Sequence, residues 1–142
     1  MSGVRRASTL LVSSAALAAG LIGSPVAAAE TTGFTSPSGN IGCILTDTEV
    51  RCDIGARDWS PPPRPADCPE YSDYGQGILL HPTGPARFVC AGDTAMGGGP
   101  VLPYGQYQAG GGMSCNSEPS GMRCSNSDGR GFRISRQRYE TF

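Results

Sequence analysis

The chain of 142 residues has no lysine, one histidine, one tryptophan and few large apolar side chains. After the first 29 residues, which we interpret below as an export signal, Leu, Ile, Val and Phe together number 16. So few large apolar groups bury too little surface to offset the conformational entropy of the chain, unless the unfolded state is constrained. The composition therefore excludes a large multidomain enzyme, a coiled coil and a well-filled α/β domain.

Basic charge is scarce as well. Residues 30–142 carry nine Arg against twelve Asp and Glu, a net charge of −3 with His81 neutral. This balance gives no sign of nucleic acid as a partner. The C-terminal end is richer in arginine and forms either an anion-binding face or, in the interpretation we favour, solvated strand ends. Its arginines are Arg123, Arg130, Arg133, Arg136 and Arg138.

The first 29 residues have the order of a signal peptide. Arg5 and Arg6 precede an apolar run over 9–22, and small residues lead to a cleavage site after Ala29, with Ala28 as the alternative. The segment after Arg6 lacks the bulky apolar residues of a twin-arginine signal, so we favour the general secretory route. The apolar run is too short to span a bilayer, and the longest later one is three residues at 78–80, so no membrane span is expected.

Six cysteines in an exported chain predict a disulfide framework. Two pairs share the spacing C-x8-C within similar surroundings, and we interpret these as two related hairpins, each closed by its own bridge. The remaining two cysteines are then left to each other. Zinc is disfavoured, because no close CxxC pair is present and the compartment is oxidising. The predicted bridges are Cys43–Cys52, Cys115–Cys124 and Cys68–Cys90.

Turn geometry supports the first bridge. A two-residue turn at Asp47-Thr48 makes Cys43 and Cys52 a non-hydrogen-bonded pair, whose Cα atoms lie close enough for a cross-strand disulfide. In the second hairpin, 118–121 suits a type I turn, and a bulge at Gly121 would shift the register by one residue.

Short alternating segments predict a mainly β fold, a small antiparallel barrel or sandwich with long Pro- and Gly-rich loops. Residues 30–142 are expected to form this single disulfide-stapled domain. The proline-rich segment 58–69 should lie extended over the surface, and 92–112 should be irregular. The expected strands are 40–45, 49–54, 77–80, 86–90, 112–116, 121–125 and 131–135.

An ordered set of motifs across nearly the whole of 30–142 resembles a family of small exported actinobacterial, mycobacterial-type proteins of unknown function. The resemblance implies export and a six-cysteine, Gly- and Pro-rich domain, and it carries no catalytic residues over to this chain. The motifs are FTSPSGNIGC at 34–43, VRCDI at 50–54, FVCAGDT at 88–94, LPYG at 102–105 and GFRISR at 131–136.

Catalytic chemistry has little support in the sequence. His81 is the only histidine and stands before Pro82 at a turn, with no nucleophile-elbow pattern beside it. His81, Arg87 and Glu70 are of the types that small secreted nucleases use, but nothing in the sequence brings them together. We therefore name no catalytic residue, cofactor or metal.

The sequence offers more candidate residues for binding than for catalysis, because aromatic rings lie in Pro- or Gly-rich loops and Tyr-Gly-Gln occurs twice. Such rings either stack on sugars or peptides or cover a thin core. The candidate ligand-binding residues are Trp59, Tyr71, Tyr74, Gln76, Tyr104, Gln106 and Tyr107.

We expect a secreted, monomeric, non-catalytic binding module at or outside the cell envelope, whose partner is an envelope polymer or an extracellular protein. The first alternative is an inhibitor of an extracellular hydrolase of protease or lysozyme type, because the rigid segment 59–68 beside a bridge is pre-organised for a cleft. A small secreted hydrolase is the weaker alternative.

Overall fold

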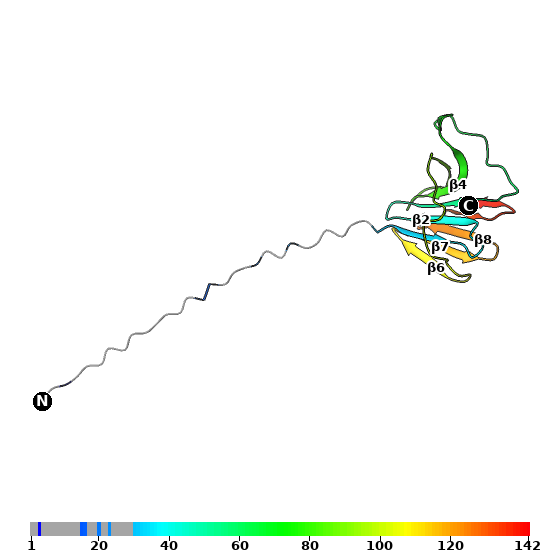
Figure 1. The fold of residues 1–142 in the computed structure, drawn as a ribbon. Helices are drawn as coiled ribbons and strands as arrows, with labels where there is room; N and C mark the ends of the chain where they lie inside the picture. The colour runs from blue at the N-terminus through cyan, green and yellow to red at the C-terminus, as the bar shows by residue number, and fades with distance from the viewer. Residues whose placement is uncertain (1–2, 4–14, 17–19, 21–22, 24–29) are drawn as a thin grey trace.

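The computed structural model describes residues 30–142, together with positions 3, 15–16, 20 and 23. Nearly all of the expected signal peptide, with its cleavage site, lies outside the described residues. The described part of the chain contains two antiparallel five-stranded sheets that pack face to face as a sandwich (Figure 1). Among these residues, none lies in a helix that could cross a membrane.

Both sheets are meanders, in which each strand pairs with the next strand along the chain. Sheet A contains β1 (Thr32–Thr35), β2 (Ile41–Leu45), β3 (Val50–Ile54), β4 (Tyr74–Leu80) and β5 (Arg87–Cys90). Sheet B contains β6 (Tyr107–Gly110), β7 (Met113–Glu118), β8 (Gly121–Asn126), β9 (Gly131–Ile134) and β10 (Tyr139–Thr141). The mainly β fold predicted from the sequence is confirmed, and the sandwich is the form it takes.

The two cysteine hairpins have the register that the turn arithmetic predicts. Cys43 pairs with Cys52, with 4.1 Å between the Cα atoms, and Cys115 pairs with Cys124 at 4.0 Å. The second hairpin keeps this register without a one-residue shift, because Glu118 pairs directly with Gly121. The third disulfide joins Cys68 to Cys90 and ties the proline-rich segment to the end of β5.

The sequence does not predict three of the observed strands, β1, β6 and β10. β6 lies inside the segment expected to be irregular, so that expectation is wrong for Tyr107–Gly110. Its Tyr-Gln-Ala-Gly sequence has no apolar alternation, and the strand forms because β7 offers a ladder to pair with. β1 and β10 are likewise short strands added to the edges of sheets whose inner strands carry the apolar pattern.

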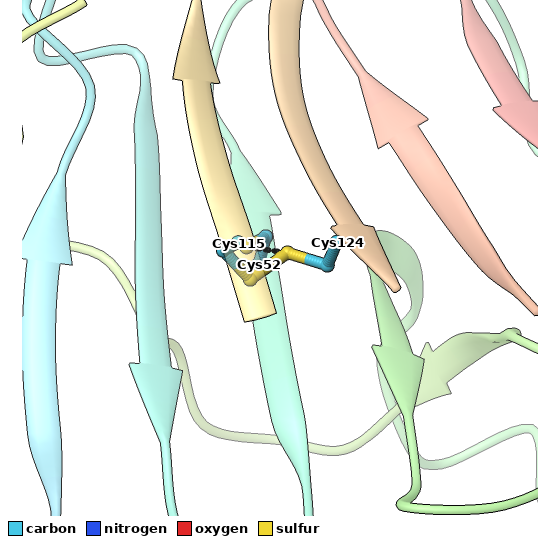
Figure 2. Close-up of side chains that lie close together, drawn as sticks. All are labelled: Cys52, Cys115 and Cys124. Atoms are coloured by element: carbon cyan, nitrogen blue, oxygen red, sulfur yellow. Dashed lines mark hydrogen bonds between the residues drawn. A yellow bond between two sulfur atoms is a disulfide. The ribbon is translucent and has the colours of Figure 1, made fainter. Parts of the chain in front are cut away.

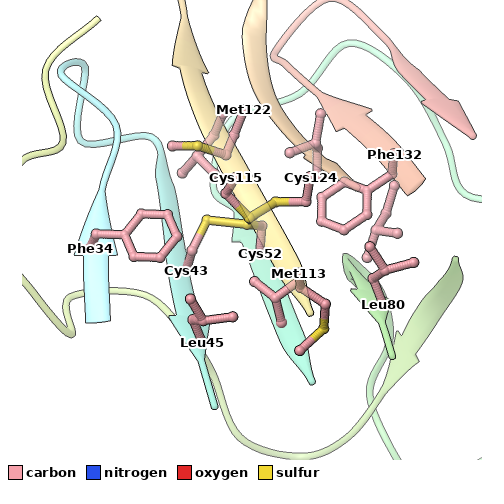
Figure 3. Packing of buried hydrophobic residues seen from close by; sticks show 14 of the residues in the cluster. Phe34, Cys43, Leu45, Cys52, Leu80, Met113, Cys115, Met122, Cys124 and Phe132 are labelled. Atoms are coloured by element: carbon pink, nitrogen blue, oxygen red, sulfur yellow. A yellow bond between two sulfur atoms is a disulfide. The ribbon is translucent and has the colours of Figure 1, made fainter. Parts of the chain in front are cut away.

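Sulfur fills the middle of the core (Figure 3). The cysteines of the two hairpins are completely buried, and the two bridges meet across the sandwich with 3.8 Å between Cys52 Sγ and Cys124 Sγ (Figure 2). Neither sulfur carries a hydrogen, so this is a van der Waals contact. Because large apolar side chains are few, the two cystines supply core volume as well as covalent constraint.

Residues 91–102 cross the outer face of sheet A and leave no room for side chains at Gly33 and Gly42. A Cβ on Gly42 would lie 2.7 Å from Ala95 O, and a Cβ on Gly33 would clash with Gly98. The segment then pairs with the edge of β1, where Thr35 N donates to Pro100 O and Leu102 N donates to Thr35 O. Glycine in these strands therefore marks close backbone approach, as expected for glycine inside a strand.

A buried ion pair holds this crossing segment. Asp53 is 1% exposed and accepts from Arg51 Nε at 2.8 Å and from Ala95 N at 2.9 Å. Arg51 also bonds Asp93 Oδ1 at 2.6 Å, which joins β3 to the segment. We call Arg51, Asp53 and Asp93 the clasp. Hydrogen bonding to Asp53 raises the pKa of Arg51, and hydrogen bonding to Arg51 lowers the pKa of Asp93.

Candidate functional site

The two ends of the sandwich differ. At the end formed by the turns 46–49, 81–86, 111–112 and 127–130, which we call the closed end, polar side chains join the sheets. Asn126 on β8 donates to His81 O and Gly84 O at 2.9 Å each, and Asp128 accepts from Gly84 N at 2.8 Å. The backbone polar groups of the β4–β5 turn are thereby paired with sheet B.

The opposite end, which we call the open end, holds a pocket of about 430 Å³. It lies where the inner faces of both sheets reach the turns 36–40, 118–121 and 135–137, with Tyr104 beside them. Ile41 and Met122, both buried, give it an apolar surface. Its volume is within the range of small-molecule sites.

Ser117 is the most unusual residue in the pocket. It follows Met113 and Cys115 on the inward face of β7 and is only 1% exposed. Its Oγ has no hydrogen-bond partner among the described residues. Most buried polar side chains in native proteins are paired, so an unpaired hydroxyl on a residue that lines a pocket makes Ser117 a candidate for contact with a ligand.

Tyr104 is fixed beside Ser117 by the backbone. Gly105 N donates to Ser117 O at 2.8 Å, and Ser117 N donates to Gln106 O at 2.9 Å. Gly105 has a φ of 85°, a conformation that favours glycine in this turn. The ring of Tyr104 is half exposed and lines the pocket.

Several other polar groups of the pocket are already engaged. Ser36 Oγ bonds Ser38 Oγ at 3.1 Å, and the Asn40 side chain both donates to Ala56 O and accepts from Ala56 N. Ser135 Oγ donates to Arg138 O at 3.0 Å. These bonds shape the pocket wall, in contrast to Ser117.

The charged groups at the pocket are paired with opposite charges. Glu118 accepts from Arg133 Nη2 at 3.0 Å, and Arg136 lies 3.7 Å from Asp58. The wider arginine-rich end follows the same pattern, since Arg133 and Arg138 both approach Glu140. Of the five arginines at this end, Arg133, Arg136 and Arg138 are therefore within ion-pair distance of a carboxylate.

The seven predicted ligand-binding residues do not form one surface. Trp59 packs between the sheets, with its ring centroid 4.9 Å from that of Tyr139 and 6.2 Å from that of Phe88, and its Nε1 donates to Ser135 O at 2.8 Å. These contacts give Trp59 a packing role at the β5–β10 side of the sandwich. We leave it out of the proposed site.

Tyr74 and Gln76 line a second, shallower hollow with Asp73, Asp93 and Thr94. The Tyr74 ring is half-buried, 6.4 Å from Phe88 and within cation–π distance of Arg64. Gln76 Nε2 donates to Ala91 O at 2.6 Å, while its Oε1 is buried without a partner among the described residues. Both side chains connect β4 to neighbouring loops.

The other candidates line neither pocket. Tyr71 is 93% exposed in the loop before β4, and Tyr107 is 67% exposed on β6. Gln106 is exposed beside Tyr107. Of the seven predicted residues, Tyr104 alone lines the open-end pocket.

His81 belongs to the closed end, where its Nδ1 lies 3.1 Å from Thr48 O and its carbonyl accepts from Asn126. Glu70 precedes β4 and Arg87 begins β5, so Glu70 and His81 lie at opposite ends of β4. The three residue types used by secreted nucleases are not brought together here.

Three sulfurs, those of Cys52, Cys115 and Cys124, lie within 4.8 Å of one another (Figure 2). All three are in disulfides, so none can offer the thiolate that binds zinc. This cluster is a packing feature of the core.

Ser117 is the functional candidate that the sequence reasoning missed. The signal was available, because Met113, Cys115 and Ser117 alternate on one face of a strand whose cysteine must point inward. A serine at the third inward position is a polar group in the core layer, and such positions call for a partner.

The fold and disulfides define a small disulfide-bonded β-sandwich. The chain belongs to a family of unknown function, DUF6636, whose model matches residues 12–142. No curated protein and no solved structure matches the chain.

Proposed function

We propose that the protein is a secreted, non-catalytic binding module that acts at or outside the cell envelope, after removal of residues 1–29 as a signal peptide. The observation that carries the proposal is the open-end pocket with its buried, unpartnered Ser117 hydroxyl. A rigid sandwich that pairs its polar groups at one end and leaves a hydroxyl free at the other is suited to binding.

Three disulfides are consistent with an extracellular protein. The single histidine is used at the closed end, and the described residues around the pocket include no histidine or cysteine to act as a base or nucleophile. These features support binding over turnover.

The test is co-sedimentation of oxidised residues 30–142, which contain the ten strands that the structure describes, with insoluble bacterial cell-wall polymer. We expect saturable binding that is lost in a reduced and alkylated sample, because reduction removes the constraint that holds the sandwich together. An absence of saturable binding would overturn the proposal. Saturable inhibition of a protease or lysozyme in the same preparation would replace it with the inhibitor function.

A further inference from the structure

Three properties of the open-end pocket restrict its ligand. It holds a buried hydroxyl that is both a donor and an acceptor, a half-exposed aromatic ring, and charged groups that are already paired. We propose that this pocket binds a single sugar ring of a neutral polysaccharide. The proposal rests on the proposed function and names the ligand class of the same site.

Ser117 Oγ calls for a partner that can both donate and accept. The residue is 1% exposed, and its Oγ has no partner among the described residues. A serine hydroxyl has one donor hydrogen and two acceptor lone pairs, and a sugar hydroxyl has the same complement. The Oγ itself has almost no accessible surface, so a ligand hydroxyl reaches it when the Ser117 side chain turns toward the pocket. The bond then satisfies a group that the free protein leaves unpaired, so the interaction favours the bound state.

Tyr104 supplies the flat surface that a sugar ring requires. Its ring is 50% exposed, and the Gly105–Ser117 backbone bond holds the turn that carries it next to the buried hydroxyl. A pyranose ring has apolar C–H faces and hydroxyl edges, so one ligand can place a face on the Tyr104 ring while an edge hydroxyl reaches Ser117. Ile41 and Met122 extend the apolar surface of the pocket.

The charges argue for a neutral sugar. Glu118 is bonded to Arg133, and Arg136 lies 3.7 Å from Asp58, so the pocket offers no unpaired charge of one sign. An anionic or cationic ligand would lose hydration without gaining a free counter-charge. A neutral, hydroxylated ligand avoids that cost and uses the polar atoms of the pocket as hydrogen-bond partners.

The experiment is a titration of isotope-labelled, oxidised residues 30–142 followed by backbone amide chemical shifts. The probes are glucose, galactose, arabinose and N-acetylglucosamine, with inorganic phosphate as the charged comparison. We expect at least one neutral sugar to give saturable shifts centred on Tyr104, Ser117 and the 118–121 turn, and phosphate to give none there.

Two matched pairs of variants test the assigned contacts. Tyr104→Ala should raise the Kd for the sugar about tenfold, because it removes the stacking face. Tyr107→Ala, which removes a more exposed tyrosine that does not line the pocket, should leave the Kd unchanged. Ser117→Ala should raise the Kd about fivefold, the worth of one hydrogen bond. Ser114→Ala, on the other face of the same strand, should not change it.

The outcomes separate this inference from the proposed function. Polymer co-sedimentation that persists in Tyr104→Ala and Ser117→Ala would leave a binding module but overturn this site. Saturable shifts elsewhere on the protein, no shifts with any of the four sugars, or stronger pocket shifts with phosphate would each overturn the neutral-sugar assignment.

Discussion

The closed and open ends of the sandwich differ in how one buried polar side chain is paired. At the closed end, the Asn126 side chain donates to two carbonyls of the β4–β5 turn and accepts from Asp128 N and Arg130 N. At the open end, Ser117 is more deeply buried than Asn126 and has no partner for its Oγ among the described residues.

This difference assigns a stabilising role to the closed end and a binding role to the open end. Each hydrogen bond that Asn126 makes across the sheets adds to the free energy of unfolding, whereas an unpaired buried hydroxyl subtracts from it. Functional sites commonly carry such a cost because the group is held ready for a ligand. The comparison assigns the only histidine to the stabilising end and the proposed site to the other.

The change with the greatest expected effect on stability is reduction of the disulfides, which would remove both ends of the sandwich together. Reducing all three disulfides should unfold the sandwich, because each bridge contributes about 2.5 to 3.5 kcal/mol on the loop-entropy model. Their sum is comparable with the whole stability of a small domain. Thermal unfolding followed by circular dichroism, with and without reductant, measures this. A reduced protein with an unchanged melting temperature would contradict the account.

The next effect concerns the clasp, which holds the segment that leads to Tyr104. Arg51→Met should lower the free energy of unfolding by about 3–5 kcal/mol, because it leaves the Asp53 carboxylate buried without its cation. Urea unfolding measures the change, and Arg87→Met, at an exposed arginine of β5, is the control. Equal effects of the two variants would mean that the crossing segment does not depend on the clasp.

Asn126→Ala tests the closed end directly. It removes two donors to His81 O and Gly84 O and two acceptor contacts, so we expect a loss of about 2–3 kcal/mol in the free energy of unfolding. Asn116→Ala, on the outer face of β7, should cost much less. If chemical denaturation gave the two variants the same stability, the closed end would not be the stabilising one.

The smallest expected effect is a pH dependence at the clasp, away from both ends. The pKa of Asp93 lies below its ordinary value of 3.8, because Arg51 donates a hydrogen bond to it. Its contribution to stability is therefore complete above that value and is lost as the pH falls through the lower folded-state pKa. Urea midpoints measured across this acid range should fall less steeply for Asp93→Asn than for the native chain. A steeper fall in the variant would reverse the sign of the linkage.

The sequence predicts the hairpins because their information is local. The C-x8-C spacing and a two-residue turn fix which residues face each other, so the bridges and the register of β2, β3, β7 and β8 follow from a few adjacent positions. β1 and β6 depend on partners and covering segments elsewhere in the fold. The close approach of Gly42 to Ala95 shows why, since a glycine in a strand does not say which segment lies over it.

The candidate site was predictable in part. The sequence predicts Tyr104 as a binding residue because it is an aromatic residue in a glycine-rich loop, and Tyr104 lines the pocket. Trp59 and Tyr74 meet the same criterion, yet they pack near Phe88. The sequence does not distinguish a ring that faces solvent from one that covers a thin core. Predicting Ser117 requires two facts: that it points inward on β7, and that no neighbouring group is placed to bond its hydroxyl. The second fact comes only from the three-dimensional structure.

The most direct test of the account is a crossed comparison of Ser117→Ala and Asn126→Ala, in which the free energy of unfolding and co-sedimentation with cell-wall polymer are measured on the same oxidised samples. Ser117→Ala should unfold at the same or higher free energy and bind the polymer more weakly. Asn126→Ala should lose stability and keep its binding per folded molecule. If both variants lost stability and binding together, or if Ser117→Ala bound as tightly as the native chain, the assignment of binding to the open end would be contradicted.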